Sequence, residues 1–459
     1  MTPPDSASIK PDTFDHSALA RGLGEAPARL TALVAKHAQG KGHSLCLVGG
    51  VVRDLLLERG SADLDFVIDS DAAAFARGLQ TRYGGRVAAH KPFGTAKWSL
   101  DAESADRLGL SLAGLPQHID FARARNEVYA EPAALPSTKP GSIEDDMRRR
   151  DFSVNALALR LSPGAQYGQL LDVCGGLPDL RNRQIRALHA RSFIDDPTRI
   201  LRALRFATRL NFAIDAQTNI WLRDALPLLK RVSGARLRNE IEQIFGEKLA
   251  GKILLGLHDV GAWQALQPGF RLSKRLAKAL RRAQEQEPPW QSADYDAPTL
   301  RWCLLLAGVE ERAARRIAIR LDLNRQQIAS ISATCRILAI AAELADPERR
   351  ASEIAPRLEK LPSAALRAGW LLLHDSPAAQ ERLRLTTQRW RTVRPCTSGH
   401  DLRALGLPPG PRYKQILERL RGAWIDGDVR SCADEQALLQ KLLESSERPP
   451  GNPPGARLL

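Results

Sequence analysis

The 459-residue sequence has no apolar run that approaches the roughly eighteen residues of a membrane-spanning helix. Its first fifteen residues, MTPPDSASIKPDTFD, lack the apolar core of a signal peptide. The six cysteines are scattered and form no Cys-x-x-Cys pair, at positions 46, 174, 303, 335, 396 and 432. We therefore expect a cytoplasmic protein without membrane contact, and neither a structural zinc site nor a disulfide bond.

Acidic residues are in deficit, because 52 Asp and Glu stand against 67 Lys and Arg, for a formal net charge of +15. Such an excess favours a polyanionic partner, with nucleic acid preferred over a role in solubility alone. Hydrophobic content of 44% and charged content of 26% are ordinary for soluble globular protein. The length predicts about two to four domains.

The chain is organised around residues 45–68, LCLVGGVVRDLLLERGSADLDFVI. The short apolar run at its start predicts a strand that ends at a Gly-Gly turn. Helical spacing follows at 51–57, with Arg53 and Asp54 on the polar side of the predicted helix. Alternation of apolar and polar residues over 64–68 then predicts a second strand.

Two features of this stretch point to nucleotide chemistry. Gly49 and Gly50 precede a helix, whose N-terminus offers free N–H groups and a positive dipole end to an anion. Asp63 and Asp65 are two positions apart, so a strand presents their carboxylates on one face. Mg²⁺ is held by one or two carboxylates together with substrate phosphates. Each feature alone is usually a tight turn or a solvated strand end, and their order along the chain predicts a nucleotidyl-transfer site.

In this order the stretch resembles the first motif of class II CCA-adding tRNA nucleotidyltransferases and bacterial poly(A) polymerases, in the polymerase-β nucleotidyltransferase superfamily. The string RRDFSVNA resembles a second motif of that family, RRDFTxNA, with Ser153 in place of the common Thr. The resemblance implies that Arg53 and Arg150 bind the triphosphate together with the glycine turn. It also implies that Asp151 accepts a hydrogen bond from the ribose 2′-hydroxyl, which selects ribonucleotides.

The string DDPTRILRALRFA, which begins at Asp195, resembles the family's E-D-x-x-R amino-acid template. Spacing of three places Asp196, Arg199, Arg202 and Arg205 along one side of a predicted helix. A carboxylate accepts from the amino group of cytosine or adenine, and a guanidinium donates to the neighbouring ring nitrogen. Uracil and guanine present the reverse pattern, and each mispaired buried contact costs about 1–3 kcal/mol. The first two side chains are thus expected to select the base, and the last two to face the triphosphate.

Residues 118–122, HIDFA, predict a further strand that carries Asp120. Because family members have an acidic residue on the equivalent strand, the resemblance implies that Asp120 completes a metal-binding triad with Asp63 and Asp65. An edge-strand aspartate exposed to water is the alternative. Residues 123–141 contain several Pro and Gly and no periodicity, so we expect a loop, either a mobile one beside the site or a surface connector.

Local patterns predict several other elements. Helical spacing predicts one helix over residues 19–38 and another over 72–83. Strands are expected at 86–89 and 96–100. Ser142, followed by acidic residues and then by helical spacing, is expected to cap a helix.

The resemblance implies an α/β nucleotidyltransferase head, a mixed sheet with helices, followed by an all-α neck, body and tail. We expect a disordered N-terminus at 1–18 and the head at 19–176. The neck, which carries the nucleotide-selecting helix, is expected at 177–250. A helical body at 251–390 and an RNA-binding helical tail at 391–459 complete the predicted order.

The implied activity is the addition of C, C and then A to the 3′ end of tRNA from CTP and ATP, with release of pyrophosphate. Two Mg²⁺ ions held by Asp63 and Asp65 would activate the RNA 3′-hydroxyl and stabilise the leaving group. Catalysis would come from alignment and charge stabilisation rather than from a protein nucleophile. The basic helical domains would hold the RNA through its phosphates.

Other functions stay open at this point. An enzyme that adds only A, whether a tRNA A-adding enzyme or a poly(A) polymerase, shares every motif. The lack of a long, strongly basic C-terminal extension disfavours the polymerase. An RNA-binding protein with an inactive head is a third hypothesis, against which the intact Asp63 and Asp65 pair argues. His-Asp pairs at 258, 374 and 400 have no evident partner histidines, which disfavours a metal phosphohydrolase and favours a capping role for His400-Asp401.

Overall fold

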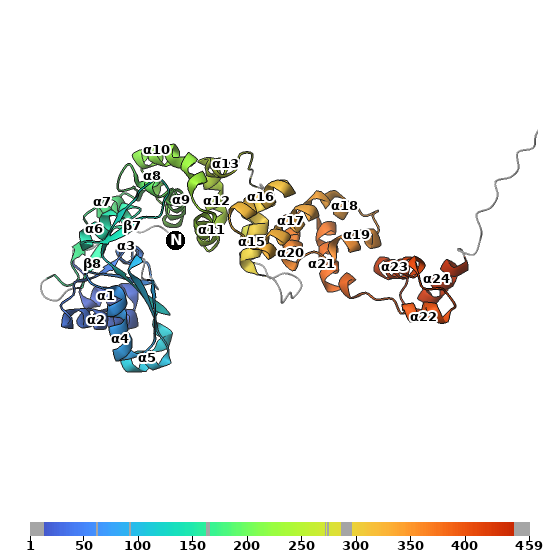
Figure 1. Ribbon diagram of the computed structural model, residues 1–459, viewed down its shortest axis with the longest axis horizontal. Coiled ribbons are helices and arrows are strands. Elements are labelled where there is room, and N and C mark those ends of the chain that lie inside the picture. The colour runs from blue at the N-terminus through green and yellow to red at the C-terminus, as the bar shows by residue number, and fades with distance from the viewer. Residues whose placement is uncertain are drawn as a thin grey trace, which may run out of the picture. The chain divides into compact units, whose positions relative to one another are not determined.

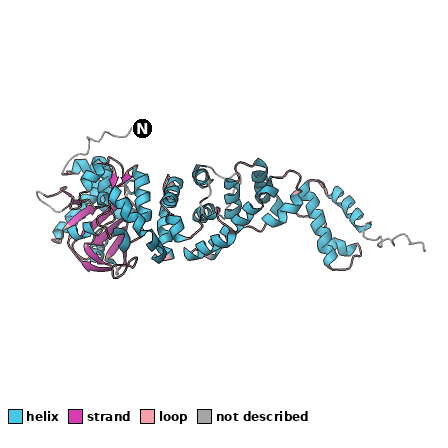
Figure 2. Ribbon diagram, turned by 90° about the horizontal axis from the view of Figure 1, so that it is seen from above, coloured by secondary structure: helices cyan, strands magenta, loops and turns pink. Residues whose placement is uncertain are grey.

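The computed structural model describes residues 13–60, 63–90, 93–161, 166–270, 272, 275–285 and 296–444. The chain divides into two compact units, Met1–Pro268 and Gly269–Leu459. Within the described residues, every strand belongs to the first unit and the second unit is helical (Figures 1 and 2). No described helix combines the length and the hydrophobicity that crossing a bilayer requires. The α/β head followed by helical segments confirms the predicted fold class.

A seven-stranded mixed sheet forms the centre of the first unit in the described chain, with strand order β3-β4-β5-β2-β1-β8-β9. Strand β1 runs antiparallel to β2 and β8, whereas β2 and β5 are parallel and place Asp65 beside Asp120. The strands are β1 (Leu45–Val48), β2 (Leu64–Ile68), β3 (Arg86–His90), β4 (Thr95–Ser99), β5 (His118–Arg123), β8 (Ala158–Arg160) and β9 (Leu170–Leu171).

The two faces of β2 are used differently, as its alternation predicts. Phe66 stacks on Phe121 of β5, and both belong to the face that helix α4 (Ala72–Tyr83) covers with Phe75. Val67 points to the opposite face and packs in a cluster with Met147 of helix α6 (Ile143–Arg148). Because side chains alternate along a strand, Asp65 shares the face of Val67, away from the aromatic layer.

The helices before and after β1 depart from their predicted form. Residues 19–38, expected as one helix, are divided between α1 (His16–Leu23) and α2 (Glu25–Gly40), since Gly24 adopts φ 94° between them. Residues 1–12 of the expected disordered segment lie outside the described residues, and α1 begins within the remainder. Helix α3 (Gly50–Leu56) is buried on all sides, so Arg53 and Asp54 do not lie on a solvated face.

Residues 123–141 were expected to be a loop, and this prediction is wrong for its two ends. Strands β6 (Arg125–Val128) and β7 (Ser137–Pro140) pair antiparallel as a hairpin, with Arg125 opposite Pro140. Ser142 caps α6 as predicted, because its hydroxyl accepts from Asp145 N and Asp145 accepts from Ser142 N. Met147, near the end of α6, packs with Cys46 and Val48 of β1 and with Val67 of β2.

The remainder of the first unit is mainly helical. The short parallel strands β10 (Gln184–Ile185) and β11 (Ala213–Ile214) tie its segments together. The predicted boundary between neck and body at residue 250 falls inside this unit, which extends to Pro268. The helices are α5 (Ala102–Leu108), α7 (Gly176–Arg181), α8 (Ser192–Asp195), α9 (Arg199–Leu210), α10 (Ala216–Ala225), α11 (Gly234–Phe245), α12 (Ala250–Asp259) and α13 (Ala262–Leu266).

In the part of the second unit that the structure describes, two apolar clusters lie between helices. The larger one surrounds Trp390 and Ile337, and a smaller one joins Leu402, Leu420 and Leu439 near the C-terminus. The helices are α14 (Leu276–Glu285), α15 (Ala297–Leu306), α16 (Glu311–Arg320), α17 (Arg325–Ala339), α18 (Ala341–Ala345), α19 (Ala351–Leu358), α20 (Ser363–Leu372), α21 (Pro377–Gln388), α22 (Gly399–Ala404), α23 (Pro411–Asp426) and α24 (Cys432–Glu444).

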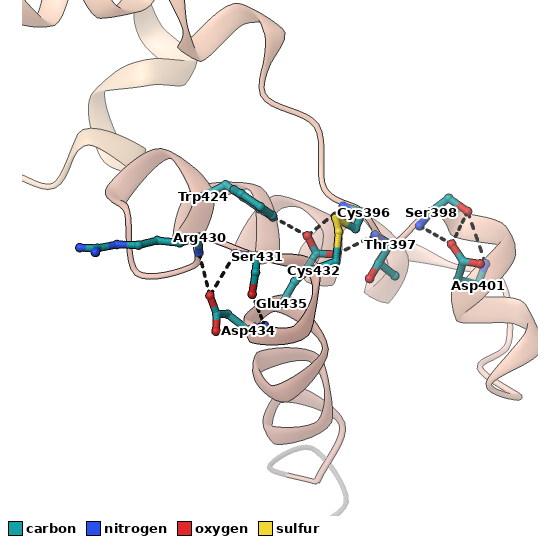
Figure 3. The surroundings of a disulfide bond; sticks show 10 residues. All are labelled: Cys396, Thr397, Ser398, Asp401, Trp424, Arg430, Ser431, Cys432, Asp434 and Glu435. Atoms are coloured by element: carbon teal, nitrogen blue, oxygen red, sulfur yellow. Dashed lines mark hydrogen bonds between the residues drawn. A yellow bond between two sulfur atoms is a disulfide. The ribbon is translucent and has the colours of Figure 1, made fainter.

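Cys396 and Cys432 form a disulfide bond, which corrects the expectation that the protein has none (Figure 3). The bond joins the segment before α22 to the first residue of α24. Beside it, the buried carboxylate of Glu435 accepts hydrogen bonds from the backbone N–H groups of Cys396 and Thr397 and from the indole of Trp424 (Figure 3). The small apolar cluster of Leu402, Leu420 and Leu439 is thus supplemented by a covalent bond and a buried hydrogen-bond network.

The His400-Asp401 pair has the predicted capping role. Asp401 accepts hydrogen bonds from the backbone N–H and the hydroxyl of Ser398, which completes a capping box at the start of α22 (Figure 3). A capping aspartate satisfies backbone donors that a helix N-terminus otherwise leaves unpaired.

Candidate active site

A cavity of about 570 Å³ in the first unit gathers nearly all of the predicted site residues. Eight arginines and six acidic side chains line it, so the lining carries an excess of positive charge that suits an anionic ligand. The lining residues are Gly49, Gly50, Val51, Arg53, Asp54, Asp63, Asp65, Glu127, Tyr129, Leu135, Pro136, Arg149, Arg150, Asp151, Asn155, Asp196, Arg199, Arg202, Arg205, Phe206, Arg209 and Arg236.

The turn between β1 and α3 brings its backbone against a guanidinium group. Gly49 adopts φ 79°, and a Cβ at this position would lie 2.7 Å from Nη1 of Arg150. Only glycine allows both this conformation and this approach. The N–H of Gly49 donates to the carbonyl of Leu157 at 2.9 Å, so this donor, which the sequence interpretation assigned to an anion, is already satisfied within the sheet.

Asp63 and Asp65 both face the cavity, as their spacing predicts. Burial raises the pKa of Asp65 to about 6, and the neighbouring carboxylate of Asp120 adds to the shift. Asp120 does not line the cavity, since it pairs with Lys97 at 3.4 Å and His118 at 3.5 Å and its side chain is 43% exposed. The structure therefore brings Asp63 and Asp65 to the site and leaves Asp120 beside it.

Three side chains that could enclose a metal ion do not converge in this structure. Across the described parts of the chain, no group of three His, Cys, Asp or Glu side chains is close enough to do so. The expected triad of Asp63, Asp65 and Asp120 is thus not assembled. Burial first, and then the Asp120 carboxylate, raises the pKa of Asp65, and carboxylate oxygens at this strand end are the ligands that hard divalent cations prefer.

Arg53 and Arg150, both predicted to bind phosphates, have different surroundings. Arg53 is only 2% exposed and donates to both oxygens of Asp54 at 2.9 Å and to Asn155 Oδ1 at 2.6 Å. Arg150 donates through Nη2 to Asp146 at 3.2 Å, whereas its Nε has no hydrogen-bond partner. Both guanidinium groups line the cavity, and the Arg53 side chain, 2% exposed, is buried more deeply than that of Arg150, which is 19% exposed.

Asp151 links the segment after α6 to helix α9. Its Oδ2 accepts from Nε and Nη2 of Arg202, at 2.9 and 2.6 Å, and its Oδ1 accepts from Phe152 N and Asn155 Nδ2. Although burial opposes it, the Arg202 guanidinium holds the pKa of Asp151 down at about 2. Four donors fill the acceptor capacity of a carboxylate. A contact with a ribose hydroxyl, as the resemblance implies, would require one of these donors to move.

The predicted template residues share the cavity but do not all lie on one helix. Helix α9 begins at Arg199, and Asp196 precedes it with φ −134°. Asp196 uses Oδ1 to accept from Thr198 N at 3.0 Å, from Thr198 Oγ1 at 2.6 Å and from Arg236 Nη2 at 2.7 Å. Arg199 donates through Nη1 to Ser192 Oγ and through Nη2 to the carbonyl of Arg149. Oδ2 of Asp196 keeps its acceptor capacity at the cavity.

Three arginines that line the cavity pack against one aromatic ring. Phe206 has the guanidinium carbons of Arg53, Arg202 and Arg205 at 5.5, 5.4 and 4.9 Å from its ring centroid. Glu240 of α11 pairs with Arg202 at 3.4 Å and with Arg205 at 3.6 Å. Such cation–π contacts and shared carboxylates hold neighbouring cations in place despite their repulsion.

Several lining residues were not predicted. Glu127 of β6 accepts from Arg125 and Arg149 and from the hydroxyl of Tyr129, and it lies in the segment expected to be a loop. Arg236 lies within the predicted neck, residues 177–250, and was not among the predicted site residues. The one available signal was Arg149, because it directly precedes Arg150 in the matched motif. The other contacts join residues far apart in the sequence and have no local pattern.

A mixed-sheet head, with two acidic residues at a strand end facing an arginine-lined cavity, defines a nucleotidyltransferase-like protein. Residues 45–186 match the family described as the poly A polymerase head domain, and residues 211–281 match one described as a probable RNA and SrmB- binding site of polymerase A. The chain is 34% identical over 424 residues to an A-adding tRNA nucleotidyltransferase of Halalkalibacterium halodurans, covering 89% of this chain and 90% of that one.

Two further comparisons agree. A CC-adding tRNA nucleotidyltransferase of Deinococcus radiodurans is 32% identical over 406 residues, covering 88% of this chain and 91% of that one. The solved structure of a CCA-adding enzyme, apo form II, aligns with a TM-score of 0.76 at 28% identity, covering 95% of this chain and 100% of that one. The chain therefore belongs to the family of tRNA nucleotidyltransferases and bacterial poly(A) polymerases.

Proposed function

We propose that the protein adds C, C and A to the 3′ end of tRNA, using CTP and ATP and releasing pyrophosphate. One observation carries this proposal: the cavity that holds Asp63 and Asp65 also gathers the base-selecting Asp196 and the arginines of α9. A nucleoside triphosphate needs cationic side chains to bind its phosphates and polar side chains to bind its base. Both kinds of side chain line this one cavity. The relatives' names, which specify tRNA nucleotidyltransferases, support the same class of substrate.

Asp63 and Asp65 would hold the divalent cation, which we propose to be Mg²⁺ bound as two ions. The chemistry of the donor set fits, because burial and the Asp120 carboxylate raise the pKa of Asp65 by more than Arg150 and Lys97 lower it, so a bound cation would stabilise the charged carboxylate. Bound magnesium would polarise the RNA 3′-hydroxyl and neutralise the departing pyrophosphate. The carboxylates themselves keep the strand end anionic and so attract the cation.

The phosphates would lie along the arginine wall. Arg150 and Arg205 each have a buried Nε without a hydrogen-bond partner. Both side chains line the cavity, where their other N–H groups would donate to phosphate oxygens. Asp151 and Glu240 fix the position of Arg202 in advance, which favours catalysis by alignment rather than by a protein nucleophile.

The base would be read by Asp196 and Arg199. Oδ2 of Asp196 would accept from the amino group of C or A, and a remaining N–H of Arg199 would donate to the ring nitrogen. In the variant Asp196→Ala we expect discrimination against U and G to fall by about tenfold or more, with a much smaller loss of triphosphate affinity. Single-nucleotide incorporation with each of the four triphosphates measures this, and an unchanged base preference would refute the assignment.

The activity itself is tested with purified full-length protein, Mg²⁺ and tRNA transcripts. The transcripts end at the discriminator base, after CC, or in an unrelated 3′ sequence, with CTP and ATP supplied singly and together. Stepwise CCA on the first transcript supports the proposal. Absence of incorporation by wild type, with RNA affinity equal to that of Asp63→Ala, would instead indicate a binding protein with an inactive head.

Addition of A alone is the second candidate, and the A-adding relative that matches 89% of this chain favours it. It predicts incorporation of A only into the transcript that ends in CC. Addition limited to CC would place the protein with the CC-adding relative, and long A tails on any RNA would identify a poly(A) polymerase. The same three transcripts therefore separate every member of the family by product length.

A further inference from the structure

One side chain joins the base-selecting carboxylate to the hairpin connection above the cavity. Arg236, on α11, donates from Nη2 to Asp196 Oδ1 at 2.7 Å and from Nη1 to the carbonyl of Ala133 at 2.9 Å. Both partners in the ion pair are 21% exposed, so the contact is largely screened from water. Hydrogen bonds between charged groups in such surroundings are about twice as strong as neutral ones.

The hairpin side of this link is firmly held. Ala133 lies in the connection between β6 and β7, is 7% exposed and adopts φ 66°, which is uncommon for a residue with a Cβ. Its N–H donates to the carbonyl of Ile194 at 3.1 Å, and its own carbonyl receives Arg236. The same connection contributes Tyr129, Leu135 and Pro136 to the cavity wall.

The carboxylate side is equally constrained. Oδ1 of Asp196 accepts two hydrogen bonds from Thr198 and one from Arg236. Three donors on one oxygen fix the rotation of the carboxylate, and therefore fix where Oδ2 lies at the cavity. Arg236 supplies the single charged donor among the three, so its loss would release most of the constraint.

We propose that Arg236 is a positioning residue for base selection, which sets the orientation of Asp196 and couples it to the β6–β7 connection. The proposal rests on the proposed function, because Asp196 must read the base for its orientation to matter. Arg236 touches neither the base nor the reacting phosphate in this assignment. Arg236 fixes the orientation of the Asp196 carboxylate. Oδ2 of Asp196 can then accept a hydrogen bond from the amino group of C or A, whereas U and G present the reverse pattern of donor and acceptor.

The chain offers matched controls. Arg231 contacts the same connection through Glu131 at 3.4 Å, but the contact is exposed and does not involve Asp196. The variant Arg231→Ala therefore weakens only the connection. The variant Thr198→Val removes one neutral donor from Asp196 and leaves the connection intact. Arg236→Met removes both contacts with little change in side-chain length, and Arg236→Lys keeps the charge with a single donor group.

The experiment measures incorporation of each nucleotide and the KM for the triphosphate in all four variants of the full chain. For Arg236→Met we expect discrimination of C and A against U and G to fall by about tenfold or more, with KM changed about twofold. Thr198→Val should lose less, Arg236→Lys should be intermediate, and Arg231→Ala should match wild type. Full selectivity in Arg236→Met overturns the proposal, and so does an equal loss in Arg231→Ala.

Two further readouts keep the result interpretable. A thermal melt shows whether Arg236→Met folds. If it does not, Arg236→Lys is tested in its place. Wild-type selectivity in both folded Arg236→Lys and Thr198→Val would then refute the proposal. If wild type incorporates nothing, the proposed function fails by itself. The preference for binding ATP over GTP, measured with the same full-length proteins by fluorescence titration, then decides the role of Arg236, because a positioning role predicts a loss of that preference.

Discussion

Replacing Asp65 by asparagine should stabilise the metal-free protein while abolishing its chemistry. The pKa of Asp65 is raised from its ordinary value of 3.8 to about 6, first by burial and then by the Asp120 carboxylate. A shift of about two pH units corresponds to about 3 kcal/mol against the charged form. Because the folded state holds this proton more tightly than the unfolded state, wild type loses that stability as the pH rises from about 4 to about 6. Asp65→Asn has no such loss.

The assay is native-state hydrogen exchange of peptides from β2 and β5, in denaturant and with a chelator, at several pH values. Above pH 6 we expect Asp65→Asn to be more stable than wild type by about 3 kcal/mol, with the difference disappearing near pH 4. Added Mg²⁺ should stabilise wild type more than the variant. Asp120→Asn is the control, since it removes only the second cause and should give a smaller gain.

Equal or lower stability of Asp65→Asn at pH 7.5 would refute the electrostatic account of this strand end. A gain that stayed constant between pH 4 and pH 7.5 would refute it as well, because a titrating carboxyl is then not the cause. Asp65→Asn could be more stable than wild type while Mg²⁺ leaves the stability of wild type unchanged. That result would support the electrostatic account and count against Asp65 as a metal ligand.

Three other changes have expected outcomes. Asp151→Asn breaks the buried pair with Arg202, so the free energy of unfolding measured in urea should fall by about 3 kcal/mol or more, and most of the activity should be lost. A variant that stays stable and active would contradict this. Gly49→Ala places a Cβ 2.7 Å from a guanidinium at φ 79°, so kcat should fall at least about tenfold, and wild-type kinetics would show that the turn tolerates it. The Cys396–Cys432 bond links residues 36 apart and so restricts the unfolded chain. Its removal should destabilise the C-terminal helices by about 4 kcal/mol. Proteolysis should then be faster than in the oxidised protein.

The core of the head could be predicted because its signals are local. The apolar run at 45–48 and the helical spacing at 72–83 match β1 and α4 residue for residue. The alternation over 64–68 correctly assigned Phe66 and Val67 to opposite faces, since the period of a strand depends only on neighbouring residues. Asp63 and Asp65 reached the cavity for the same reason, without knowledge of any other element.

The errors occur where a distant partner decides the structure. Arg53 and Asp54 read as a polar helical face, yet each neutralises the other, so both can be buried. The β6–β7 hairpin is held by cross-strand pairing that a Pro-rich segment does not reveal. The disulfide joins cysteines 36 positions apart, and no spacing rule identifies such a pair in a scattered set.

Distant partners also determine how the residues of the predicted template motif are arranged. The sequence shows four charged residues at a spacing of three, and all four reach the cavity. Their partners stand far away in the sequence: Asp151 lies 51 residues before Arg202, and Arg236 lies 40 residues after Asp196.

These partners determine what the charges can do. An arginine already held by a buried carboxylate meets a phosphate without reorganising, and an aspartate held on one oxygen presents the other in a fixed direction. Under the proposed function, base selection and phosphate alignment would therefore depend on these partners as well as on the motif residues. Variants that remove a partner should be as informative as variants that remove the motif residue itself.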